Sequence, residues 1–97
     1  MNIPQNVKIG SIIYSVIMEN VKHEGLSENN NWGKINFDEC KIYLNDTLAD
    51  QKISEVFFHE VLHGIEHHFC MDLKEVEIDR LSHGLAEVLK DNGLLKE

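Results

Sequence analysis

Cysteine and basic residues are scarce in this chain of 97 residues. The two cysteines, Cys40 and Cys70, do not form a Cys-x-x-Cys pair, so we expect reduced thiols, with zinc ligation by either one as an alternative. Seventeen acidic residues against nine basic ones give a formal net charge of −8, and the sequence contains no basic cluster. This balance argues against nucleic acids and anionic membranes as partners.

Long apolar runs are also missing. No stretch approaches the roughly 18 apolar residues of a membrane span, and the first six residues, Met-Asn-Ile-Pro-Gln-Asn, lack the features of a signal peptide. We therefore expect a cytoplasmic protein. A composition of 42% hydrophobic and 27% charged residues is typical of a globular chain, and we expect residues 1–97 to form one small domain.

The first half of the sequence predicts a small sheet. Residues 7–18 are rich in β-branched side chains and are interrupted by Gly10-Ser11, which predicts two strands joined by a tight turn. Residues 32–37 and 41–45 alternate apolar and polar side chains, which predicts a β-hairpin. The polar stretch 19–31 is expected to be a loop. A hairpin strand at the sheet edge could pair with an extended peptide.

The second half predicts two helices. Thr47 and Asp50 resemble a capping box that would start a helix at residue 48 or 49 and continue to about residue 67. Asp72 is a plausible cap for a second helix over residues 73–90. Because their connection is short, the two helices should be antiparallel neighbours. The expected fold is α+β, a small antiparallel sheet of three to four strands followed by two antiparallel helices.

The first of these helices carries the pattern His-Glu-x-x-His at residues 59–63. Four-residue spacing on a helix stacks His59 and His63 on one face, where both can ligate one metal ion with Glu60 beside them. Imidazole and carboxylate ligands suit Zn²⁺, and three protein ligands leave a position for water whose pKa falls towards about 7. Glu60 could take the proton of that water, the minimum apparatus for hydrolysing a peptide bond. Histidines that merely pack or cap are the alternative.

The second helix should supply a third ligand, because two histidines rarely suffice. Its acidic residues are Glu75, Glu77, Asp79 and Glu87. At 100° per residue, Glu77 lies about 70° from the centre of the apolar stripe and Glu75 about 90° away on the other side. The sequence therefore predicts Glu77 as the third ligand, with Asp79 as a secondary possibility.

The order of a short sheet, a helix with His-Glu-x-x-His, and a second helix reading Glu-Ile-Asp-Arg-Leu-Ser from residue 77 resembles the gluzincin metallopeptidases. It is closest to the small ImmA/IrrE-like and phage-type minimal members, over roughly residues 7–93. The resemblance implies a zincin-like metallopeptidase domain in which Zn²⁺ is held by His59, His63 and Glu77, with Glu60 as the general base. It also implies that Asp79 fixes the tautomer of a ligating histidine.

These 97 residues contain no counterpart of the C-terminal domain of larger gluzincins, so we expect only half of a substrate cleft and no obvious donor to the oxyanion. Tyr43 and His67 are the alternatives for that role. The expected activity is zinc-dependent hydrolysis of a peptide or protein, with an activating protein partner as a further hypothesis. The alternative is a zinc-stabilised binding or regulatory protein, of phage or mobile-element type, with little or no catalytic activity. A metal-free interaction module is a third hypothesis.

Overall fold

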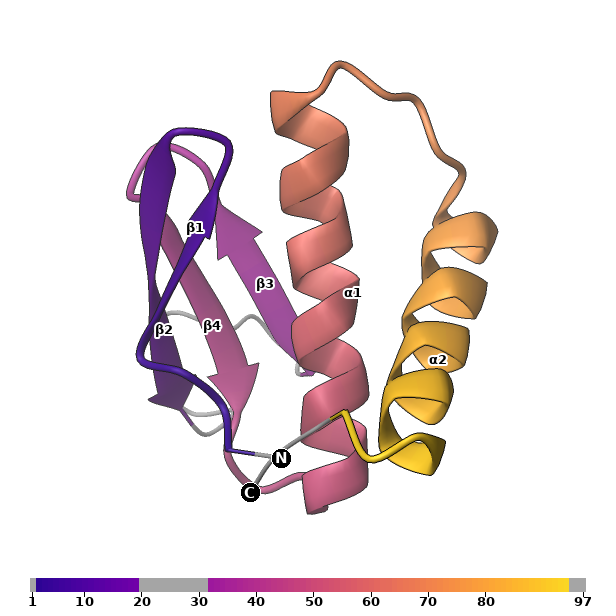
Figure 1. Cartoon of the computed structure of the whole chain (residues 1–97). Helices are drawn as coiled ribbons and strands as arrows, with labels where there is room; N and C mark the ends of the chain where they lie inside the picture. The colour runs from indigo at the N-terminus through magenta and orange to yellow at the C-terminus, as the bar shows by residue number, and fades with distance from the viewer. Residues whose placement is uncertain (1, 20–31, 95–97) are drawn as a thin grey trace.

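Four strands and two helices follow one another along the chain in this computed structural model, which describes residues 2–19 and 32–94 (Figure 1). Their bounds are β1 Asn6–Ile9, β2 Ile12–Glu19, β3 Gly33–Asn36, β4 Lys41–Asn45, α1 Asp50–His68 and α2 Glu75–Asp91. The α+β class, the two hairpins and both helices are confirmed, with helix ends within two residues of those predicted. The loop was predicted over residues 19–31; Glu19 instead ends β2, and residues 20–31 lie outside the described residues.

The sheet is mixed, and the expectation of an antiparallel sheet was wrong in one pairing. The strand order is β1-β2-β4-β3, with both hairpins antiparallel and β2 parallel to β4. Alternating side chains and a tight turn specify each hairpin locally, but they do not specify how two hairpins lie side by side. The observed order leaves β3 as an edge strand, next to α1 (Figure 1).

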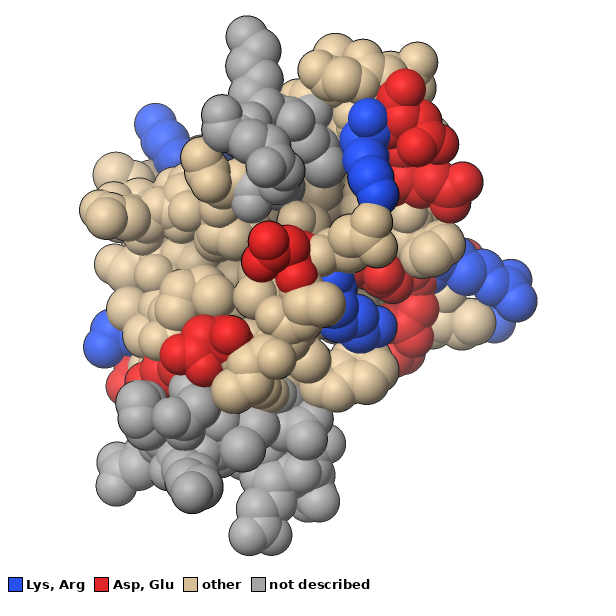
Figure 2. Space-filling model, turned by 90° about the horizontal axis from the view of Figure 1, so that it is seen from below, with Lys and Arg blue, Asp and Glu red and all other residues tan. Residues whose placement is uncertain are grey.

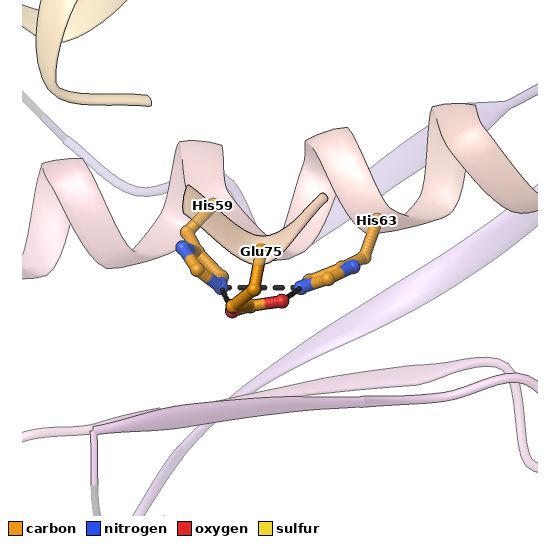
Figure 3. A group of neighbouring side chains, drawn as sticks. All are labelled: His59, His63 and Glu75. Carbon is orange, nitrogen blue, oxygen red and sulfur yellow. Dashed lines mark hydrogen bonds and ion pairs between the residues drawn. The ribbon is translucent and has the colours of Figure 1, made fainter. Parts of the chain in front are cut away.

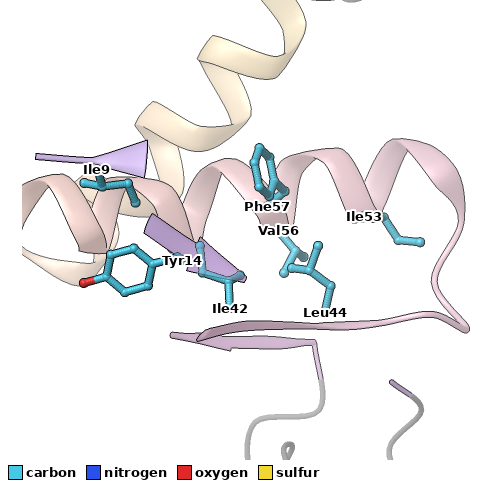
Figure 4. Packing of buried hydrophobic residues seen from close by; sticks show 7 residues of the cluster. All are labelled: Ile9, Tyr14, Ile42, Leu44, Ile53, Val56 and Phe57. Carbon is cyan, nitrogen blue, oxygen red and sulfur yellow. The ribbon is translucent and has the colours of Figure 1, made fainter. Parts of the chain in front are cut away.

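The core lies between the sheet and one face of α1 (Figure 4). Its buried residues come from the strands and from the first half of the helix: Ile9, Tyr14, Ile42, Leu44, Ile53, Val56 and Phe57. Burying such a side chain contributes about 1.5–3 kcal/mol. Gly33 allows α1 to approach β3 closely, because a Cβ there would lie 2.5 Å from Val56 Cγ1. This packing fixes the position of the helix that carries the His-Glu-x-x-His residues.

Neither helix begins with the cap that was predicted from sequence. The Thr47 amide and hydroxyl lie 2.9 and 2.6 Å from Asn45 Oδ1, and α1 begins after Ala49 with no side-chain cap. The N-cap of α2 is Lys74 rather than Asp72, and its backbone N–H donates to Glu77 Oε1 at 2.8 Å. A polar side chain near a helix start can form hydrogen bonds with several different backbone groups. The spacing of polar residues in the sequence therefore did not identify the residue that caps each helix.

Helix α2 is antiparallel to α1, as predicted, and among the described elements it packs on α1 alone (Figure 1). Its only buried residues are Ile78 and Ser82. The apolar stripe of α2 has its centre between Leu81 and Leu85 and was expected to face α1, but these residues are 49% and 39% exposed. The buried face of α2 is therefore rotated away from its most apolar stripe.

On the face of the molecule seen in Figure 2, Lys and Arg side chains are interspersed among acidic and uncharged residues rather than gathered in one patch. Neither helix in the described ranges 2–19 and 32–94 combines the length and apolar character needed to cross a membrane.

Candidate metal centre

His59 and His63 lie one turn apart on the face of α1 that is turned towards α2 (Figure 3). Their Nε2 atoms are 3.1 Å apart, and the side chains are only 19% and 26% exposed. The four-residue spacing therefore brings the two imidazoles together as predicted. The packing of α1 on the sheet fixes where the backbone of both residues lies.

Glu75 completes the group from the first turn of α2 (Figure 3). One carboxylate oxygen lies 2.9 Å from His59 Nε2, and the other lies 3.3 Å from His63 Nε2. Ligands about 2.0–2.1 Å from a tetrahedral Zn²⁺ stand roughly 3.3 Å from one another. The Nε2–Nε2 distance of 3.1 Å is close to that value, and each of the three residues offers one ligand atom within 4.8 Å of the other two, so the donor set and its spacing fit a zinc ion.

Glu77, the third ligand predicted from sequence, is not brought to the two histidines. Its carboxylate accepts the Lys74 N–H at the start of α2, and the described group that could hold a metal contains Glu75 instead. The physical reason is the rotation of α2 described above. Residues 75, 78, 79 and 82 share the face turned towards α1, because spacings of three and four residues return to one side of a helix. The spacing of these four residues could have identified this face from the sequence, but the stripe of larger apolar residues was the more prominent pattern.

Asp79 contacts the other nitrogen of a histidine in the group. Its Oδ1 lies 2.9 Å from His59 Nδ1. A carboxylate at Nδ1 favours a hydrogen on that atom and leaves the Nε2 lone pair free to bind a metal. Asp79 thus lies beside the imidazole of His59, four residues after Glu75 on α2.

Glu60 is buried between α1 and β3, with 6% of its surface exposed. The pKa of its carboxyl is raised from 4.5 to about 7, mainly by burial; the nearby His63 lowers this pKa and Glu75 raises it, and the value of about 7 includes both. A Cβ at Gly33 would lie 3.4 Å from Glu60 Oε2, so the absence of a side chain there lets the carboxylate approach the edge strand. A carboxyl whose pKa is near 7 can exchange a proton readily at neutral pH.

Two cavities meet at Glu60. The smaller, about 180 Å³, is on the His59 side and has Trp32, Lys52, Glu55, Glu75, Asp79 and Ser82 among its lining residues. The larger, about 440 Å³, is on the His63 side and is lined by Lys34, Ile35, Phe37, Glu60, His63, Glu66, His67 and Met71. Glu60 therefore contributes to the lining of both cavities.

The two residues considered for the oxyanion differ in position. Tyr43 is 8% exposed, and its hydroxyl donates to Glu39 Oε1 at 3.0 Å. His67 lines the larger cavity together with Glu60, and its ring stacks on Phe37 with centroids 3.9 Å apart. Of the two, His67 is the one that borders the cavity. Cys40 and Cys70 are free thiols, and neither belongs to the described group that could hold a metal.

Comparisons with known proteins identify no matching protein family, no similar characterised protein and no similar solved structure. The likeness to gluzincins therefore depends on the motif residues and on the site that they form.

Proposed function

We propose that this protein is a zinc-dependent metallopeptidase in which His59, His63 and Glu75 hold the ion and Glu60 is the general base. One observation carries the proposal. Three residues from two helices each offer a ligand atom of a type that suits Zn²⁺ within 4.8 Å of the other two, next to the buried Glu60, which lines both cavities. When bound, the ion would supply a Lewis acid for the substrate carbonyl and would acidify a water molecule.

The protein's own residues would divide the remaining work. Glu60 would accept the proton of the attacking water and return it to the leaving amine. Asp79 would hold the His59 ring with Nε2 directed to the ion. The substrate would need an extended backbone to reach Glu60 between α1 and β3.

The edge strand β3 favours a peptide as the substrate. The Trp32 carbonyl accepts the Asn45 N–H at 2.9 Å, and in an antiparallel pair such bonds recur at every second residue. The backbone groups of Gly33 and Ile35 therefore face away from β4, and no described strand pairs with that outer edge. An extended peptide added there would run past Glu60, because Gly33 lies beside its carboxylate.

The test uses full-length protein purified without a histidine tag, stripped with a chelator and reloaded with zinc. Cleavage of a peptide library, followed by mass spectrometry, should require zinc in the wild type. Glu60→Gln should bind zinc as the wild type does and cut nothing. Cleavage that persists in Glu60→Gln, or in chelator, would contradict the proposal.

A zinc-stabilised binding protein is the second candidate, and the packing of α2 favours it. Only Ile78 and Ser82 of this helix are buried, and Glu75 and Asp79 of the same helix contact His59 on α1. An ion shared by α1 and α2 would stabilise the fold even without catalysis. This candidate predicts that chelation lowers the melting temperature while the zinc-loaded protein leaves every library peptide intact.

A further inference from the structure

We propose that Glu66 is a positioning residue that holds His63 in its metal-binding orientation and ties the same imidazole to the connection that leads into α2. Glu66 lies on α1, three residues after His63, and one of its carboxylate oxygens is 3.3 Å from His63 Nδ1. The other oxygen accepts the Leu73 N–H at 2.7 Å. The side chain is 19% exposed, so both contacts are partly shielded from water.

The contact with Nδ1 determines which nitrogen of His63 is free. A neutral imidazole carries one hydrogen, and a carboxylate beside Nδ1 favours the hydrogen there. His63 Nε2 is then left as an acceptor, directed at His59 Nε2 and at Glu75. Glu66 on α1 contacts Nδ1 of His63, as Asp79 on α2 contacts Nδ1 of His59. Each imidazole therefore has its own carboxylate partner at Nδ1.

With both Nδ1 hydrogens engaged, the two Nε2 atoms and the Glu75 carboxylate are three acceptors facing one another. They lie 2.9 to 3.3 Å apart, where unshielded lone pairs repel. A cation relieves that repulsion by binding all three. Glu66 therefore prepares the group for a metal ion before the ion arrives.

The second contact links the same carboxylate to the position of Glu75. Leu73 lies two residues before Glu75, and the backbone carbonyl of Glu66 also accepts the Met71 N–H at 2.9 Å. Glu66 thus holds residues 71 and 73 of the connection while it orients His63. A carboxylate can accept at both oxygens, whereas a glutamine amide has only one acceptor oxygen.

This inference rests on the proposed zinc site, and its first test is zinc affinity, measured by competition with a chromophoric chelator. Glu66→Ala should bind zinc about 10- to 100-fold more weakly than the wild type, and Glu66→Gln should fall between them. Glu87→Ala is the matched control. It also removes one carboxylate, but Glu87 is on α2 and contacts His83, so the affinity should not change.

The second test is the tautomer of His63 in the metal-free protein, read from long-range ¹⁵N–¹H spectra at alkaline pH, where imidazoles are neutral. The hydrogen should be on Nδ1 in the wild type and should move towards Nε2 in Glu66→Ala and Glu66→Gln. His59 is the internal control, because Asp79 still contacts its Nδ1.

The outcomes separate the two claims. A wild type that fails to bind zinc would refute the proposed function, while the tautomer would still test Glu66. Wild-type zinc affinity in both Glu66 variants, or an unchanged His63 tautomer, would overturn the role of Glu66. If Glu66→Ala fails to fold, Glu66→Gln provides the comparison.

Discussion

The sheet with α1 and the helix α2 are two regions held in different ways. The first region has an apolar core, and all four strands and α1 contribute buried or half-buried side chains to it. By contrast, α2 buries only Ile78 and Ser82. Yet the candidate site draws on both, with His59, Glu60 and His63 on α1, and Glu75 and Asp79 on α2. One half of the site is fixed by core packing. The other half is on a helix that buries little apolar surface, so we expect metal binding and α2 docking to be coupled.

The largest contrast should appear between two leucines. Leu44 is fully buried in the core, and Leu44→Ala should lower the free energy of unfolding by about 2–5 kcal/mol. Leu81→Ala, the matched change on α2, removes a side chain that is 49% exposed and should cost less than about 1 kcal/mol. Urea denaturation of both variants measures the difference, and equal losses would show that α2 is as firmly packed as the sheet.

The next effect concerns Glu60 in chelated protein. Because its pKa in the folded state is raised from 4.5 to about 7, the folded protein prefers the protonated carboxyl. The stability that this preference contributes is present below pH 4.5 and is lost as pH rises through about 7. The difference between these values corresponds to roughly 3 kcal/mol at most.

Glu60→Gln should therefore stabilise the metal-free protein above pH 7 and have little effect below pH 4.5. Glu55→Gln, on the same helix, is the control and should change stability by less than about 0.5 kcal/mol at either pH. Thermal unfolding over this pH range tests the prediction. A Glu60→Gln effect that does not vary with pH would mean that burial of the charge is not its cause.

The third contrast lies within the first turn of α2. Glu75→Ala should weaken zinc binding by about 100-fold or more. Even the loss of a residue that only hydrogen-bonds to a ligand typically lowers metal affinity by about 10- to 100-fold. Glu77→Ala, two residues further on, should bind zinc as the wild type does, because its carboxylate contacts the Lys74 amide instead. Titration with a competing chelator distinguishes them. A larger loss of zinc affinity in Glu77→Ala than in Glu75→Ala would instead identify Glu77 as the ligand, as predicted from the sequence.

The smallest effect is the cap that Glu77 provides. Its removal should lower the local stability of α2 by about 1 kcal/mol. In hydrogen exchange, amides of residues 75–91 should lose protection while those of α1 stay protected, since α2 packs only on α1 among the described elements. Uniform loss of protection over both helices would instead indicate that they unfold as one unit.

Local patterns in the sequence predicted most of the fold and half of the site. Two hairpins, two helices and the facing pair His59 and His63 all follow from periodicity and turn residues. The parallel pairing of β2 with β4 does not, because it joins two hairpins that are separate in the sequence. Glu75 was missed because α2 turns Ile78 and the small Ser82 towards α1 and leaves the larger leucines exposed. The position of the largest apolar side chains on α2 therefore did not identify the face that packs on α1.

The most direct test of the account is a crystal structure of the zinc-loaded, untagged protein with anomalous scattering recorded at the zinc edge. We predict one ion between α1 and α2, bound by Nε2 of His59 and His63 and by the Glu75 carboxylate at about 2.0–2.2 Å, with one position left open. An ion bound elsewhere, or no ion between the two imidazoles, would contradict it.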